Sequence, residues 1–252
     1  MNELLGYFQY DFARTALLAG LIVSLLGALV GFFVVLRRMA FVAVGVSHAA
    51  LGGVALGVLF GQSPILWAVG FSIVVALAMA ALGQRGVAED TAMGVFFPAA
   101  MAFGVVVISY SEGWRRDLLS YLFGNILAVT SEDLWVLGGV GLVVAVLVAV
   151  YFKELLFISF DEESAHAAGV PVARMRTLLL VLTAVTVVIS MKVVGTVLVS
   201  AMLVIPTATA AQLTSRWQWL LLGSVLVAVS SILAGLLISF TNNVATGPAA
   251  VL

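Results

Sequence analysis

Long apolar segments alternate with short polar interruptions along the whole chain. Each apolar segment holds about 20 residues, the length of α-helix that crosses roughly 30 Å of hydrocarbon. Strands of a membrane barrel would instead alternate strictly over about 10 residues, a pattern that the sequence lacks. The pattern predicts an all-α, polytopic transmembrane helical bundle of about eight spans, within a range of seven to nine. The spans are expected at 13–36, 40–60, 64–82, 92–110, 134–152, 177–191, 193–213 and 217–240.

Two shorter segments predict helices that do not cross the membrane. Residues 118–128 are too few to span it, and we expect them to form an interfacial or re-entrant helix on the outer side. The polar stretch at 160–171 predicts a two-turn surface helix, which Asp161 caps and Gly169 ends. A connector between spans needs only a few residues, so an ordered acidic helix suggests that a partner docks there.

The composition is that of an integral membrane protein. The chain is 63% hydrophobic and 9% charged, whereas soluble domains carry about a quarter charged residues. Its net charge of −1 gives no indication of nucleic-acid binding, and the lack of cysteine excludes disulfides and thiolate metal sites. The polar, acidic start lacks the basic region of a cleavable signal peptide. Residues 1–252 are interpreted as one transmembrane domain, with a further helix that begins after Pro248 and is truncated at Leu252.

The cationic residues indicate the orientation. If the polar stretch at 160–171 is cytoplasmic, that side collects more arginine and lysine than the outer side, as the positive-inside rule requires. The chain then begins outside, and Lys192 reaches the outer interface. Glu89 and Asp90 are expected to precede the fourth span on the cytoplasmic side and to cap its N-terminus. The cytoplasmic set is Arg37, Arg38, Arg85, Lys153, Arg174, Arg176 and Arg216, against Arg14, Arg115, Arg116 and Lys192 outside.

His48 is the candidate site residue because it lies inside a predicted span. An imidazole is costly in hydrocarbon, so it should face a pathway, a partner helix or a small buried network. A structural histidine and a site histidine are both open interpretations. A helical metal pair would need a carboxylate or histidine four residues away, but that position is Val44. Beside His48 runs a row of small residues, interpreted first as a packing ridge: Gly45, Ala49, Gly53 and Gly57.

Motifs for catalysis are missing from the sequence. It contains no phosphate-binding loop, zinc-protease motif or nucleophile elbow, so no catalytic residue is expected. The span interiors lack the carboxylates that a proton-coupled pump typically needs. Pro206 can kink the seventh span as a hinge, or it can mark a packing defect that Thr207 and Thr209 stabilise. The chain is interpreted as a passive pathway that another protein drives.

Five segments, in order along the chain, resemble the permease subunits of bacterial ABC importers for zinc, manganese and iron. Residues 37–40 with 47–49 resemble the second-span signature of that family, and 89–94 its fourth-span start. Residues 122–127 are similar to its outer re-entrant segment, 160–171 to its coupling helix and 194–206 to its late-span core. The resemblance implies a multi-pass protein of the bacterial inner membrane that works as a dimer, with itself or with a related permease.

The resemblance also implies partners and site residues. A cytoplasmic ATPase subunit would hold the ATP and bind the coupling helix, and an extracytoplasmic metal-binding protein would deliver the cargo. No permanent cofactor is implied, and His48 would line the pathway as a transient ligand of the transported metal. The ridge and Pro206 would serve packing or hinge movement in that pathway. The coupling residues would be Phe160, Asp161, Glu162, Glu163, Ala165 and Gly169.

The sequence departs from the family at two positions. The family commonly has aspartate at the position of Val44 and proline at that of Gly52. Three explanations stay open: a looser metal site, an aspartate that a different permease supplies, or a substrate that is a metal chelate or another small solute. Two classes outside ABC transport also remain: an ion-coupled secondary carrier and a non-transporting membrane scaffold. Neither explains an ordered acidic helix as well.

Overall fold

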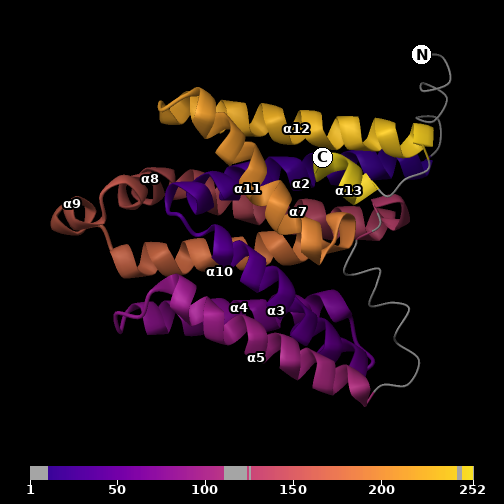
Figure 1. The fold of residues 1–252 in the computed structure, drawn as a ribbon, viewed down its shortest axis with the longest axis horizontal. Helices are drawn as coiled ribbons and strands as arrows, with labels where there is room; N and C mark the ends of the chain where they lie inside the picture. Colours follow the sequence, from indigo (N-terminus) through magenta and orange to yellow (C-terminus); the bar gives the residue numbers. More distant parts are fainter. Residues whose placement is uncertain (1–10, 111–123, 125, 243–245, 252) are drawn as a thin grey trace.

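The computed structural model describes residues 11–110, 124, 126–242 and 246–251, and these ranges contain helices and turns but no strand. Eight of the described helices are long and apolar enough to cross a membrane, so the predicted bundle of about eight spans is confirmed (Figure 1). The spanning helices are α2 (Asp11–Leu36), α3 (Ala40–Leu59), α4 (Pro64–Gly83), α5 (Glu89–Ser109), α7 (Ser131–Val150), α10 (Val172–Val194), α11 (Thr196–Leu213) and α12 (Trp217–Asn242).

The short elements lie at the two ends of the bundle. After the fifth span the chain forms α8 (Phe152–Phe160) and α9 (Glu162–Ala167), which project from one end in Figure 1. At the other end, Ile126–Ala128 form a single 3-10 turn, η1, and α13 (Thr246–Val251) follows α12. Most of the re-entrant helix predicted at 118–128 lies outside the described residues, as do Arg115 and Arg116.

One helix was not predicted, and several predicted span boundaries differ from the observed ones. α8 was not expected, because its apolar residues continue the hydropathy of the fifth span across the break at Tyr151. α10 begins at Val172 rather than 177, since its first turns carry arginines that lower hydropathy without disfavouring a helix. α5 begins at Glu89, so Glu89 and Asp90 lie in its first turn rather than before it. Hydropathy marks where a helix enters hydrocarbon, whereas the helix itself extends beyond that point.

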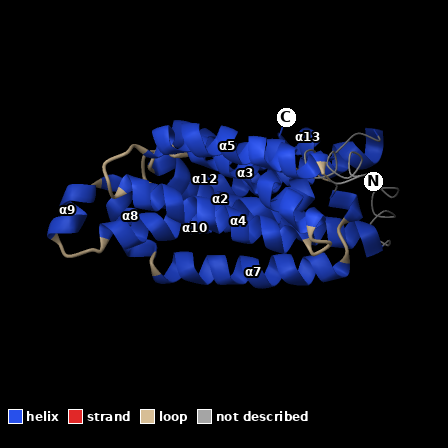
Figure 2. Cartoon of the chain, turned by 90° about the horizontal axis from the view of Figure 1, so that it is seen from below, coloured by secondary structure: helices blue, strands red, loops and turns tan. Residues whose placement is uncertain are grey.

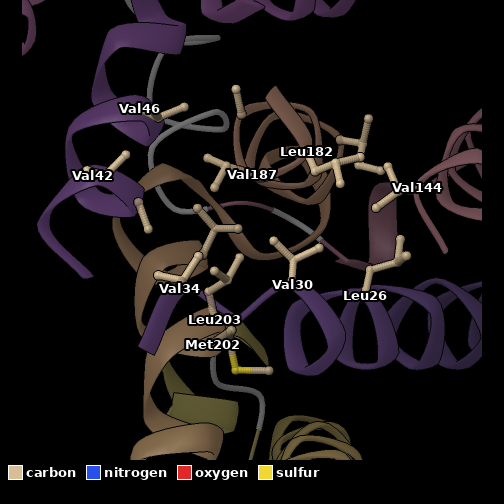
Figure 3. Packing of buried hydrophobic residues seen from close by; sticks show 14 of the residues in the cluster. Leu26, Val30, Val34, Val42, Val46, Val144, Leu182, Val187, Met202 and Leu203 are labelled. Carbon is tan, nitrogen blue, oxygen red and sulfur yellow. The ribbon is translucent and has the colours of Figure 1, made fainter. Parts of the chain in front are cut away.

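The core is built around α2 and α10. The largest fully buried side chains include Phe32 and Phe33 of α2 and Leu179 and Leu180 of α10. Figure 3 shows side chains of α2, α7, α10 and α11 meeting in one apolar layer. α5 and α7 lie on opposite edges of the bundle in Figure 2. One edge of the bundle is therefore formed by α5 and the opposite edge by α7.

The α2 and α11 backbones approach closely at Gly31. A Cβ added there would lie 1.9 Å from the carbonyl oxygen of Leu203, so no other residue fits without movement of the helices. At its end, α2 turns sharply into α3 through a Schellman motif. The amide of Met39 donates to the carbonyl of Val34 at 2.8 Å, and Arg38 adopts a left-handed φ of 59°. These contacts fix the direction in which α3 leaves α2.

Candidate functional site

His48 lies on α3 with its ring half-buried against Phe97 of α5. The two ring centroids are 5.3 Å apart at an interplanar angle of 77°. Nδ1 of His48 lies 2.9 Å from the carbonyl oxygen of Val44, a contact that requires the proton on Nδ1. The tautomer is thus assigned from its hydrogen bond. In that tautomer Nε2 keeps its lone pair and is the atom that can bind a metal ion.

The described residues of a single chain do not complete a metal site around His48. The described residues contain no group of three or more histidine, cysteine, aspartate or glutamate side chains that could hold a metal ion. Val44 lies one turn before His48 on the same half-buried strip and offers only a methyl surface there. Ser47 donates its hydroxyl to the Val44 carbonyl at 2.7 Å and is fully buried. The other ligands of any metal must come from outside this cluster.

The small residues beside His48 pack α3 against α4 and α5. A Cβ added at Gly45 would lie 2.0 Å from Sδ of Met93, and one at Gly53 would lie 2.6 Å from the backbone of Ala68. At Gly57 it would lie 2.6 Å from Cα of Pro64, and Ala49 is fully buried. The packing interpretation of the ridge therefore agrees with the contacts. His48 sits on the neighbouring strip, which this packing leaves accessible.

Pro206 is buried within α11. The expectation that Thr207 stabilises the proline-induced defect is wrong, because its buried hydroxyl has no hydrogen-bond partner among the described residues. Thr209 is exposed on the same helix. The role of Pro206 as a hinge stays a prediction.

The predicted surface helix is α9, and its cap forms as expected. Oδ1 of Asp161 accepts a hydrogen bond from the amide of Ser164 at 2.9 Å. The hydrogen bonds from the side chain and backbone of Ser164 hold the pKa of Asp161 below its usual value. Gly169 ends the segment with a left-handed φ of 86°. Ala165 is buried beneath α9, whereas Phe160, Glu163 and His166 are exposed.

Glu162 of α9 is held by two arginines from different spans. Its carboxylate accepts a hydrogen bond at 2.9 Å from Arg37, whose side chain is 9% exposed and also donates to the carbonyl of Ile158 at 2.8 Å. Arg176 of α10 contacts the other carboxylate oxygen, and its Nε lies 3.4 Å from Oε1 of Glu89. We call Arg37, Glu89, Glu162 and Arg176 the cytoplasmic charge cluster. It joins α9 to the end of α2 and the starts of α5 and α10.

No local pattern in the sequence indicates the cytoplasmic charge cluster. Arg37 and Glu162 are 125 positions apart, and the position of Glu89 at a helix start predicts a capping role but not its ion pair with Arg176. The predicted orientation places all four residues on the same side of the membrane, and this is the signal in the sequence that they could lie close together. At the opposite end Lys192 pairs with Asp133 of α7 at 2.6 Å, so it does more than reach the interface.

Comparison with known proteins places the whole chain in one group. The model of the ABC 3 transport family matches residues 9–252. A "Manganese transport system membrane protein MntC" of Halalkalibacterium halodurans is 38% identical over 100% of this chain and 88% of its own length. A "High-affinity zinc uptake system membrane protein ZnuB" of Haemophilus influenzae is 34% identical over 97% of this chain and 94% of its own length.

Solved structures share the same architecture. A chain of "PsaBC from Streptococcus pneumoniae in complex with Fab" superposes with a TM-score of 0.87 at 34% identity, over 98% of this chain and 90% of that one. A second, described as an inward-facing conformation of a putative metal-chelate type ABC transporter, gives a TM-score of 0.77 at 18% identity, covering 94% and 81%. The second likeness concerns the fold alone.

Proposed function

Because this chain belongs to the ABC 3 transport family, we propose that it is the membrane-spanning permease of an ATP-driven importer that carries a divalent transition metal. It is a multi-pass membrane protein, and it acts as a pathway rather than as a catalyst. The names of its relatives favour manganese or zinc as the cargo. Iron, which the sequence resemblance also allows, has no such support. The single supporting observation in the site is the free Nε2 of His48 on an accessible strip of α3.

The arrangement around His48 supports a pathway shared between two permease copies. One imidazole nitrogen binds a transition-metal ion only weakly, and neutral imidazole suits zinc, manganese or iron as part of a larger set. A second copy facing the same strip would bring a second His48, and water would add oxygen ligands. Weak binding suits a conduit, because the ion must leave on the other side. A partner permease with a carboxylate opposite Val44 would serve the same purpose.

The position of α9 supports its role as the coupling helix. It projects beyond the membrane-spanning helices at the end that carries most arginines (Figure 1). Glu163 of α9 and Phe160 at the end of α8 are exposed and can contact an ATPase subunit, while Glu162 is engaged within the chain. ATP-driven closure of two ATPase subunits would displace two α9 helices and switch the pathway from outward to inward access. An outer binding protein would deliver the ion at the opposite end.

Uptake of radioactive manganese and zinc by cells that depend on this permease tests the proposal. We expect His48→Ala to reduce uptake at least ten-fold, because it removes the one nitrogen ligand of each copy. Ser230→Ala, on the exposed face of α12, is the matched control and should transport normally. Normal metal uptake by His48→Ala would instead favour a metal chelate or another small solute as the cargo, the alternative that Val44 motivates.

A second experiment separates an ABC permease from a scaffold or secondary carrier. Glu163→Lys reverses a charge on α9 without touching the cytoplasmic charge cluster. We expect it to reduce co-purification of the ATPase subunit and to abolish transport. A scaffold would tolerate the reversal, and a carrier would continue to move metal on an ion gradient after ATP is depleted. Either result would contradict the proposed function.

A further inference from the structure

Two hollows lie at opposite ends of α10, where it passes α4. The outer hollow, of about 190 Å³, lies between α4, α7 and α10 and includes Leu66, Val136 and the Lys192–Asp133 ion pair. The cytoplasmic hollow, of about 380 Å³, is formed by the end of α4 and the first turns of α10. Its lining residues are Gln84, Ala173, Arg174, Thr177, Leu178 and Val181.

The face that carries both hollows has the side chains of a lipid-facing surface. Leu66 of α4 is 69% exposed and Val136 of α7 is 51% exposed, and both line the outer hollow, which in a membrane protein means contact with hydrocarbon. Trp135, at the outer end of α7, is 83% exposed, as expected for an aromatic side chain at the membrane interface. α7 lies on the opposite edge of the bundle from α5, the helix that contacts His48 (Figure 2). This face therefore points away from the proposed pathway.

The cytoplasmic hollow changes from apolar to cationic along α10. Leu178 and Val181 lie deeper in the membrane, and Thr177 uses its hydroxyl within the helix, donating to the carbonyl of Ala173 at 2.8 Å. Arg174 lies one turn nearer the cytoplasm and is exposed. Within the part of the chain that the structure describes, neither Arg174 nor the exposed Arg85 beside Gln84 has an acidic partner. Arg37 and Arg176, by contrast, are both paired.

We propose that the cytoplasmic hollow binds an anionic phospholipid of the inner leaflet. The phosphate group contacts Arg174, Arg85 and Gln84 lie near the headgroup, and one acyl chain covers Leu178 and Val181. Each arginine near an anionic membrane surface raises the binding affinity about five-fold. The outer hollow gives an internal contrast, because Asp133 neutralises its lysine at 2.6 Å and leaves no net charge to select an anion. The location of this hollow at the cytoplasmic end of the bundle rests on the membrane orientation adopted in the proposed function.

Native mass spectrometry of the full chain, purified with its co-purifying subunits from phosphatidylglycerol-containing membranes, tests this site. We expect bound phosphatidylglycerol on the unmodified permease and about five-fold less on Arg174→Gln. Arg174→Gln combined with Arg85→Gln should lose still more. Arg216→Gln, which removes another exposed cytoplasmic arginine at the start of α12, should keep the lipid. Equal retention by Arg174→Gln and Arg216→Gln would overturn the proposal.

Other occupants of the hollow give distinct results. The chain has no cysteine, so Val181→Cys introduces a unique thiol into the hollow. Cross-linking of this thiol to a lipid that carries a photoreactive acyl chain supports the proposal, whereas a disulfide between two permease copies overturns it in favour of a protein interface. His48→Ala should retain the lipid even where it loses metal uptake. Failure of the transport proposal and failure of the lipid proposal are therefore distinguishable.

Discussion

Replacing Glu162 with glutamine should loosen the attachment of α9 to the membrane helices. The carboxylate accepts hydrogen bonds from Arg37, at 2.9 Å, and from Arg176, and a hydrogen bond to a charged group contributes about 1.5–3 kcal/mol. The Glu162 side chain is 38% exposed, so solvent screens these pairs and the smaller value applies to each. Arg37, only 9% exposed, would keep the Ile158 carbonyl as its acceptor. We expect a net loss of about 1–3 kcal/mol.

Thermal unfolding of the purified permease in detergent measures this loss. A decrease of about 2 kcal/mol corresponds to a melting temperature lowered by roughly 4–8 °C for a domain of this size. Glu163→Gln is the matched control, because it removes the same charge from the next position, where the described residues offer no salt-bridge partner. Its effect should stay within about 0.5 kcal/mol. Equal melting temperatures for the two variants would refute the assignment of α9 stability to the cytoplasmic charge cluster.

Three further predictions concern other parts of the molecule. Val44→Asp introduces a carboxylate one turn from His48, and isothermal titration with zinc or manganese should show at least ten-fold tighter binding; unchanged affinity would show that this strip of α3 does not bind the metal. Gly31→Ala brings a Cβ against the α11 backbone and should cost about 1–3 kcal/mol in thermal unfolding, whereas Gly70→Ala, with open space around it, should cost almost nothing. The lowered pKa of Asp161 means that its helix cap is present above about pH 4 and is lost as the pH falls through that pKa. Hydrogen exchange in α9, corrected for intrinsic rates, should therefore accelerate under acid, and Asp161→Ala should remove the pH dependence; an unchanged dependence would contradict the capping role.

The sequence was sufficient for features that depend on local pattern. Spans follow from the length of apolar segments, and α9 follows from the cap at Asp161 and the stop at Gly169, both of which the structure confirms. Features that depend on contacts between distant segments were missed. The ion pair between Arg37 and Glu162 joins residues 125 positions apart, and no periodicity reports such a distance.

The site was predictable to a similar extent. The position of His48 beside a packing ridge followed from helical spacing, and the contacts of Gly45 and Gly53 agree with it. Its tautomer did not follow, because that depends on where Nδ1 lies relative to the Val44 carbonyl. The two hollows on α10 were also beyond the sequence, since they arise from the shapes that neighbouring helices leave between them.

Surface segments between helices usually tolerate insertions, because few contacts fix their length. The segment from Phe160 to Val172 is an exception. Glu162 lies within it and is bound on one side by the end of α2 and on the other by α10. One added residue between α9 and α10 would rotate or displace the carboxylate relative to both arginines. The length of this connection is therefore set as strictly as the register of a buried helix, although most of its surface is open to water.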